Sequence, residues 1–291
     1  MPDVSHLIER AAAQLGQSGP LGRIAPAPPE GPARHGVPPS PLGAPASDVP
    51  AIPMALLGKA GLVSGGTELK MSVEELWLAQ RPVLRTAFGT LGPYEGAPLN
   101  LIMVTSARPG EGKSFAALNL AGSIARQGDH PVLLVDADMK HRSLSMTFGL
   151  GEASGLFDLA EADDLDHARM IVPTELPGLS FLPSGRSRTR STDLLSRRHT
   201  GALVQGFARE HPERLVLIDT APCLALGDAS ALAALVGQII VVVEAERTQR
   251  AELEKALELL HECPNIWLLL NKSRHTASSI RYGYYDPNYK H

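Results

Sequence analysis

Beyond residue 70, short apolar runs alternate with stretches whose apolar residues recur at helical spacing. The runs are rich in Val, Ile and Leu, and they predict strands at residues 101–105, 132–135, 179–182, 215–218, 239–243 and 266–270. Helical spacing predicts helices at residues 113–127, 200–210, 228–236 and 249–262. Continuous apolar strands with helices between them are typical of a parallel sheet covered on both faces. The pattern therefore predicts an α/β fold with a doubly wound, mostly parallel sheet.

The chain before residue 101 has a different pattern. A helix is predicted at residues 73–80, and a second short helix begins near Pro82, because proline is tolerated in a first helical turn but not inside a helix. Residues 5–15 predict another short helix, which is either a fraying end or a docking peptide for a partner. Eleven prolines fall between Pro20 and Pro53, so we expect an extended, disordered linker there.

These patterns divide the chain into four parts. We expect a short N-terminal helix in residues 1–18, a Pro/Gly-rich linker in 19–69, a folded domain in 70–272 and a C-terminal tail in 273–291. Four of the five tyrosines lie in the last ten residues of that tail: Tyr282, Tyr284, Tyr285 and Tyr289. Gly, Asp, Pro and Asn between them disfavour regular structure, so the tail should be flexible enough to carry a hydroxyl to a distant site. Packing of the aromatic tail on the surface or on a partner is the alternative.

Composition and charge exclude several classes of protein. The chain has 291 residues, 44% of them hydrophobic, and a formal net charge of −4, which leaves no global basic field for nucleic acid. Its two cysteines, Cys223 and Cys263, cannot form a disulfide framework or a zinc site by themselves. No apolar stretch is long enough to span a membrane, and no secretory leader pattern precedes residue 20. We therefore expect a cytoplasmic protein.

The strongest chemical signal is the segment 105–114, Thr-Ser-Ala-Arg-Pro-Gly-Glu-Gly-Lys-Ser, between a predicted strand and a predicted helix. This is the setting of a phosphate-binding loop, although Ala107 stands where a first glycine is usual. Glycines let backbone N–H groups face phosphate oxygens, and the helix adds its positive N-terminal end. The residues expected to contact a nucleotide here are Pro109, Gly110, Glu111, Gly112, Lys113, Ser114 and Phe115. The sequence thus predicts a fold of the P-loop NTPase type.

Acidic residues follow two other predicted strands. Asp136 and Asp138 come after residues 132–135, and Asp219 comes after residues 215–218. Ligands of doubly wound sheets lie beyond the carboxyl ends of the strands, so these acids should lie near the phosphates. Ser114, Asp138 and Asp219 are the expected oxygen ligands of Mg²⁺, partly through water. The alternative is that each acid caps a helix.

The loop, a hydrophobic-Asp-x-Asp segment ending at Asp138, and Asp219-Thr-x-Pro followed by Asp228-Ala229 together resemble the bacterial tyrosine autokinases over residues 70–291. Residues 7–12 and 192–196 resemble the subfamily found with exosortase-linked exopolysaccharide loci. The resemblance implies a protein-tyrosine kinase that uses ATP and Mg²⁺ and phosphorylates its own tail tyrosines, in a neighbouring subunit. It also implies catalytic roles for Lys113, Asp136, Asp138 and Asp219, with Asp136 accepting the tyrosine proton. Asn271 resembles an adenine-contacting residue of related ATPases, or is an ordinary turn residue.

The same resemblance implies partners. A membrane polysaccharide co-polymerase would activate the kinase and hold it at the inner membrane, self-association is expected, a phosphotyrosine phosphatase would reverse the reaction, and no nucleic acid takes part. Family members form rings through a helix with Glu-x-x-Arg-x-x-Arg, whereas the corresponding residues here are Glu75, Leu78 and Arg81. Two alternative functions stay open: a partition-type ATPase, whose signature lysine is Arg108 here, and an ATP-binding scaffold of the co-polymerase.

Overall fold

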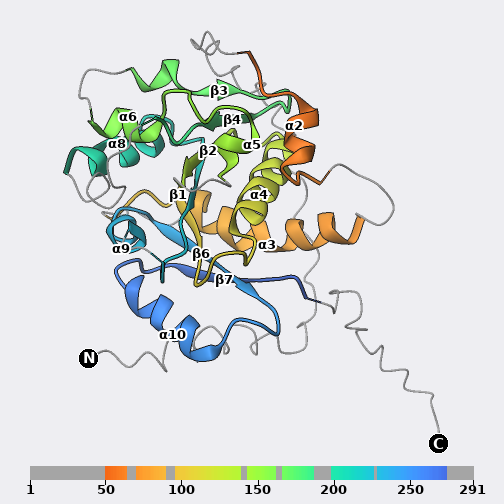
Figure 1. The fold of residues 1–291 in the computed structure, drawn as a ribbon, viewed down its shortest axis with the longest axis vertical. Helices are drawn as coiled ribbons and strands as arrows, with labels where there is room; N and C mark the ends of the chain where they lie inside the picture. Colours follow the sequence, from red (N-terminus) through yellow and green to blue (C-terminus); the bar gives the residue numbers. More distant parts are fainter. Residues whose placement is uncertain are drawn as a thin grey trace, which may run out of the picture.

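The computed structural model describes residues 50–63, 70–89, 96–138, 143–161, 166–186, 198–225 and 228–273. Seven strands form one sheet in the order β3-β4-β2-β5-β1-β6-β7 (Figure 1). The strands are β1 Leu101–Ser106, β2 Val132–Ala137, β3 Val172–Pro173, β4 Leu179–Leu182, β5 Leu215–Thr220, β6 Gln238–Glu244 and β7 Ile266–Asn271. All neighbours are parallel except β3 and β4. The predicted mostly parallel sheet is confirmed.

Helices cover both faces of the sheet (Figure 1). The helices are α2 Met54–Lys59, α3 Lys70–Phe88, α4 Lys113–Gln127, α5 Leu144–Thr147, α6 Leu156–Glu161, α8 Arg198–Arg209, α9 Asp228–Ala233 and α10 Arg250–Leu259, with a 3-10 turn at His167–Arg169. The first face carries α6, α8, α9 and α10, and the second carries α2, α3, α4 and α5. None of the described helices is long and apolar enough to cross a membrane.

Successive side chains of each central strand point to opposite faces of the sheet, so the hydrophobic core has two parts, one on each face. In β1, Leu101 and Met103 point to the first face, while Ile102 and Val104 point to the second, and all four are fully buried. Because successive side chains of a strand point to opposite faces, a strand covered on both sides must be apolar at every position. This requirement explains the unbroken apolar runs of the sequence.

The region around Pro82 differs from the prediction of two helices. Residues 70–88 form the single helix α3, with Pro82 inside it. Pro82 has no N–H for the carbonyl of Leu78 one turn earlier, but Leu78 is 54% exposed and water can solvate that oxygen. Gln80 and Val83 are buried on either side of the proline. Packing of both halves of the helix on the sheet therefore outweighs the lost hydrogen bond.

The end of the predicted linker also differs from expectation. Residues 50–63 pack against the domain, and Leu57 of α2 is 1% exposed. Ile52 bridges to Thr174, next to β3. The side chain of Asn119, on α4, accepts from Val63 N at 2.8 Å and donates to Gly61 O at 2.9 Å. The prediction of a linker up to residue 69 was wrong for this segment, because proline content does not reveal a few apolar residues that dock on a helix.

The other large elements agree with the sequence. All six predicted strands and the four predicted helices are present, with ends that differ by up to three residues. The sequence patterns did not predict α2, α5, α6 and β3, which are six residues or shorter. The helix predicted at residues 5–15 and the tail beyond residue 273 lie outside the described residues.

Replacing Asn119 with Ala tests how residues 60–63 are held. The substitution leaves the buried N–H of Val63 without its partner, so we expect the free energy of unfolding to fall by about 1–3 kcal/mol. Urea denaturation measures the change. Gln127→Ala, at the exposed end of the same helix, is the matched control and should change stability by less than about 0.5 kcal/mol. Equal effects of the two substitutions would contradict this account.

Candidate active site

The loop between β1 and α4 has the conformation that its glycines permit. Gly110 and Gly112 have φ angles of 89° and 95°, in the left-handed region that L side chains rarely adopt. A Cβ at position 112 would also collide with the side-chain amide of Asn271. Helix α4 then starts at Lys113, so its free N–H groups and positive end face the loop. This arrangement is suited to binding an anion such as a phosphate.

The ammonium group of Lys113 lies among carboxylates from two other strands. Its Nζ is 2.7 Å from Asp138 Oδ2 and 3.7 Å from Asp219 Oδ1, and it donates to Ser114 Oγ at 3.0 Å. Burial lowers the pKa of Lys113, but the negative charges of Asp219 and Asp138 outweigh this effect and raise it above its ordinary value. Lys113 is therefore a fixed positive charge in a nearly dry site, which strengthens its attraction for anions.

The carboxylate of Asp136 contacts α5, whereas those of Asp138 and Asp219 lie beside Lys113. Asp136 and Asp219 are in register on adjacent strands, and both side chains are fully buried. The Oδ1 of Asp136 accepts from Asp138 N at 3.0 Å, and its Oδ2 accepts from the N and the Oγ of Ser145 at 2.8 and 2.6 Å. Burial raises the pKa of Asp136, and the bonds from Ser145 oppose the rise. Asp136 thus connects the end of β2 to α5.

Asp219 is the least satisfied polar group of the site. Neither of its carboxylate oxygens has a hydrogen-bond partner among the described residues. Burial raises the pKa of Asp219 to about 7, although the charge of Lys113 opposes the rise. A buried carboxylate normally pairs with a charge or coordinates a metal. Its two oxygens, beside Ser114 and Asp138, fit the oxygen-ligand chemistry of a hydrated Mg²⁺ ion.

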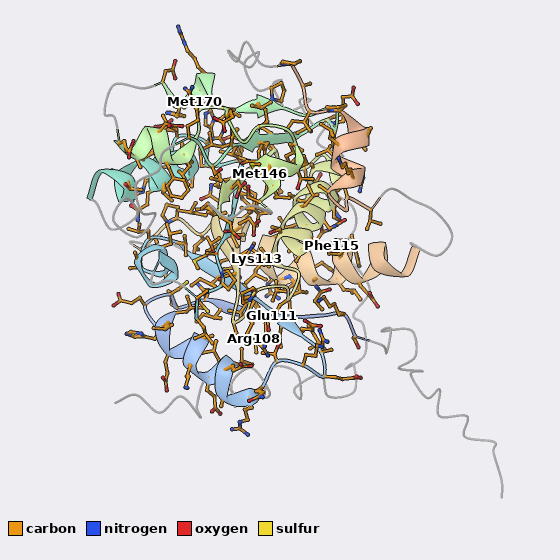
Figure 2. All side chains as sticks on the ribbon, in the orientation of Figure 1. Arg108, Glu111, Lys113, Phe115, Met146 and Met170 are labelled. Carbon is orange, nitrogen blue, oxygen red and sulfur yellow. The ribbon has the colours of Figure 1, made fainter. Side chains whose placement is uncertain are left out.

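A group of side chains, which we call the loop clamp, holds the outer side of the loop. The clamp consists of Glu111, Thr248, Asn271 and Lys272. The buried carboxylate of Glu111 accepts from Arg108 N at 2.8 Å and from the hydroxyl of Thr248. Asn271 Nδ2 donates to Glu111 O at 2.8 Å, and Lys272 Nζ donates to Gly110 O at 2.7 Å. Figure 2 shows Lys113, Glu111 and Arg108 following one another from the middle of the molecule toward α10.

The clamp fixes which way the peptide groups of the loop point. In a planar trans peptide, the carbonyl oxygen and the next N–H point in opposite directions. When Lys272 and Asn271 hold the carbonyls of Gly110 and Glu111 outward, the N–H groups of Glu111 and Gly112 must point inward. Lys272 is itself at a φ of 57° and pairs with Glu244 at 3.1 Å. The ends of β6 and β7 therefore preorganise the N–H groups for an anion.

Several known proteins resemble this chain. Over 161 residues it is 37% identical to the putative tyrosine-protein kinase EpsB of Ralstonia nicotianae, covering 55% of this chain but 21% of that relative. Over 193 residues it is 30% identical to the tyrosine-protein kinase CpsD of Streptococcus agalactiae, covering 66% of this chain and 82% of CpsD. The chain belongs to the bacterial tyrosine-protein kinases. No family model matches it.

The fold supports membership of this kinase family. The kinase domain of the Escherichia coli tyrosine kinase ETK superimposes with a TM-score of 0.54 at 28% identity, over 61% of this chain and 69% of that domain. The chain spans about a fifth of the length of the first curated relatives that it matches. The relatives and the shared fold confirm the family predicted from the sequence.

Several residues named from the sequence have contacts that sequence reasoning did not predict. The side chain of Glu111 binds inside the protein, so only its backbone remains for a phosphate. Phe115 is 43% exposed, and its ring lies against Gly61. Asn271 uses its amide nitrogen to hold the loop, and its contact with adenine stays a prediction. Arg108 pairs with Glu252 of α10 at 3.6 Å.

The structure adds residues that the sequence did not indicate. Ser145, Thr248 and Lys272 contact Asp136 or the loop, but they lie 9, 137 and 162 residues from their partners. Serine, threonine and lysine are common on surfaces, so no sequence signal distinguishes these three. Glu75, Leu78 and Arg81 all lie on α3, where Leu78 is exposed and Arg81 lies over the Trp77 ring at 4.6 Å.

The raised pKa of Asp219 predicts a pH dependence of stability in metal-free solution. Between about pH 4 and 7 the folded state holds a proton that the unfolded state releases, so the stability should fall as pH rises through this window. Asp219→Asn should flatten that slope and be more stable than the parent chain at pH 8. Urea denaturation from pH 5 to 8 in EDTA measures both effects. The exposed Asp129→Asn is the control, and parallel curves for parent and Asp219→Asn would disprove the assignment.

Amide hydrogen exchange tests the loop clamp without nucleotide, and ATP binding provides a second test. Lys272→Met and Asn271→Ala should speed amide hydrogen exchange of residues 110–112, because the outer carbonyls lose their donors. Each should also weaken ATP binding by about two- to tenfold, the range for one hydrogen bond. Lys255→Met, on α10, is the matched control for the lost charge. Unchanged exchange in both clamp variants would show that the loop holds its shape alone.

Proposed function

We propose that this chain transfers the γ-phosphoryl group of ATP to tyrosine hydroxyls of its own C-terminal segment. The observation that carries the proposal is the convergence of Lys113 on Asp138 and Asp219 at the end of a glycine-bent loop. The cluster Tyr282, Tyr284, Tyr285 and Tyr289 supplies acceptors of the required kind. Family membership supports the reaction class.

In this mechanism the loop binds the triphosphate through inward-facing N–H groups and the positive end of α4. Lys113 exchanges its contacts with Asp138 and Asp219 for the β- and γ-phosphates, where its charge stabilises negative charge that builds up during transfer. Positioning of the hydroxyl in line with the γ-phosphate accounts for most of the rate. Phosphoryl transfer of this kind needs little help from a base.

We assign different roles to the two acids of the Asp-x-Asp segment. The sequence resemblance implies that Asp136 accepts the tyrosine proton, yet both its oxygens accept hydrogen bonds and it is fully buried. We therefore propose Asp136 as a positioning residue that orients Asp138 and α5. Asp138, whose Oδ2 contacts Lys113, then accepts the proton once Lys113 has moved to the phosphates.

Mg²⁺ would be held by Ser114 directly and by Asp138 and Asp219, partly through water. When bound, the ion neutralises phosphate charge and orients the β- and γ-phosphates. The oxygens of Asp219, which accept no hydrogen bond from a described residue, support this assignment.

The acceptor tyrosines belong to a neighbouring copy, so the reaction occurs in trans, in an assembly of identical chains. Each added phosphate brings close to two negative charges, which weakens binding of the tail at a site lined with carboxylates. A membrane polysaccharide co-polymerase activates the kinase and places it at the inner membrane. Cycles of phosphorylation and removal by a phosphotyrosine phosphatase then regulate exopolysaccharide polymerisation and export.

Radiolabel transfer from ATP tests the proposed activity. Lys113→Ala should reduce self-labelling by at least about a hundredfold, because the transition state loses its fixed charge. A chain with the four tail tyrosines changed to Phe should lose labelling but keep ATP binding, and Tyr94→Phe is the matched control. Mass spectrometry identifies the modified residues. Full labelling of either of the first two chains would refute the proposal.

A further inference from the structure

A groove between α3 and the edge strand β7 lies outside the catalytic residues. It has a volume of about 980 Å³, and its lining residues are Leu78, Arg81, Pro82, Arg85, Thr86, Gly89 and Trp267. The lining contains two arginines and no acidic residue. Neither arginine forms an ion pair with a residue that the structure describes. The groove therefore offers positive charge that no described carboxylate neutralises.

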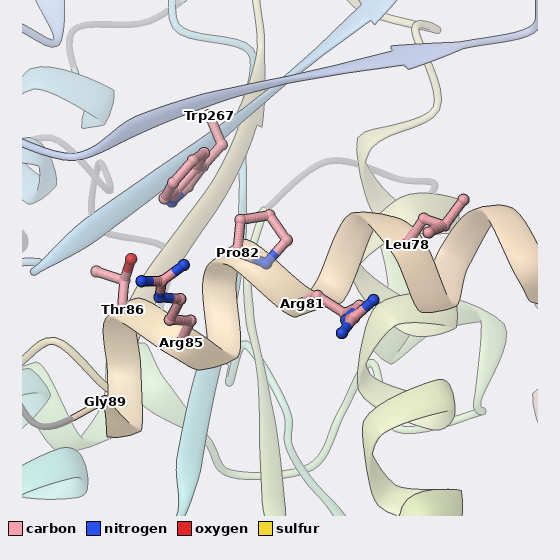
Figure 3. A pocket seen from close by; sticks show the side chains of 7 residues that line it. All are labelled: Leu78, Arg81, Pro82, Arg85, Thr86, Gly89 and Trp267. Carbon is pink, nitrogen blue, oxygen red and sulfur yellow. The ribbon is translucent and has the colours of Figure 1, made fainter. Parts of the chain in front are cut away.

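The polar and aromatic groups of the groove are close to each other in space. Figure 3 shows the guanidinium of Arg85 beside Thr86, with the indole of Trp267 above them and Pro82 alongside, whereas Arg81 points toward the other end of the groove. Arg85 is exposed and Trp267 is partly exposed, so a ligand can reach both. A guanidinium binds phosphate with two parallel hydrogen bonds, and an indole packs on an aromatic ring.

The aromatic wall of this groove is held in place from behind. Trp267 Nε1 donates to Gln238 Oε1 at 2.8 Å, and Gln238 Nε2 donates to Val83 O of α3 at 3.2 Å. Gln238 is fully buried, so this chain of bonds fixes the indole relative to the helix that carries Arg85. A wall that is ordered in advance loses little entropy when a ligand binds.

We propose that this groove binds phosphotyrosine from the tail of the same chain, residues 282–289. A guanidinium, a hydroxyl and an indole match the phosphate and the ring of that side chain, which carries close to two negative charges. The proposal rests on the proposed function, because that reaction makes the phosphotyrosine. It adds a place where the product is held, away from Lys113.

The length of the chain allows its own tail to reach the groove. The described part ends at Ser273, six residues after Trp267, so the two are at most about 20 Å apart. Nine residues lead from Ser273 to Tyr282, and they span up to about 30 Å when extended. A tether of this length gives an effective concentration in the millimolar range, which favours the tail of the same chain over a second copy.

Binding of synthetic peptides tests the groove independently of kinase activity. The receptor is the full chain with the four tail tyrosines changed to Phe, and the probe is a peptide of residues 280–291 with or without phosphate on its tyrosines. We expect the phosphopeptide to bind and to change the fluorescence of Trp267, measured in a Trp77→Phe background. Arg85→Gln should weaken binding by about tenfold, the effect of one charge-assisted hydrogen bond.

The controls separate the possible outcomes. Arg209→Gln removes an exposed arginine of α8 and should leave binding unchanged. Equal binding of the unphosphorylated peptide, or full binding to Arg85→Gln, would overturn the proposal. If the chain does not label itself but the phosphopeptide still binds, the proposed kinase activity is refuted and the groove remains a phosphotyrosine site.

A semisynthetic chain with a phosphorylated tail tests which copy supplies the ligand. The phosphorylated tail of the same chain should block binding of the added phosphopeptide to the same degree at every protein concentration, because it competes within one molecule. Blocking that disappears on dilution would show that the tail of a second copy occupies the groove and would overturn the assignment to the same chain.

Discussion

The active-site end of the molecule depends on one ammonium group. Lys113 lies within 4 Å of carboxylates that arrive from two neighbouring strands, while the loop that carries it follows a third. These strands are adjacent and parallel in the order β2-β5-β1, so their carboxyl ends meet at one edge of the sheet. Buried acids would repel each other without a positive charge between them, and Lys113 supplies that charge.

The second constraint comes from the strands on the other side of β1. The ends of β6 and β7 hold the outer carbonyls of the glycine-bent loop, and so turn its N–H groups toward the proposed phosphate site. The same β7 carries Trp267, the aromatic wall of the groove proposed to bind phosphotyrosine. The last residue of β7 thus contacts the glycine-bent loop, and a residue near the start of β7 lines the proposed phosphotyrosine groove. The Tyr-rich tail follows β7 in the sequence.

Packing also decides the shape of the chain before β1. Helix α3 runs through Pro82 because buried residues on both sides of the proline pack on the sheet. Residues 61–63 follow the surface of α4 because Asn119 bonds to Gly61 O and Val63 N. The proline that ends a helix by local rules instead lines the groove with Arg85 and Thr86. Local propensity was a poor guide here, since the deciding contacts lie far away in sequence.

The sequence by itself determined the parallel sheet, the phosphate loop and the acids at the strand ends. Unbroken Val, Ile and Leu runs require burial on both faces, and a glycine-rich turn before Lys-Ser has few other physical uses. Only the tertiary structure decided that Asp136 bonds to Ser145, that Glu111 faces inward, and that Asn271 and Lys272 hold the loop. Those contacts join residues up to 162 positions apart, and their residue types are too common to reveal a partner. Periodicity records which side of an element is buried, whereas the identity of a distant neighbour depends on how the whole sheet is ordered.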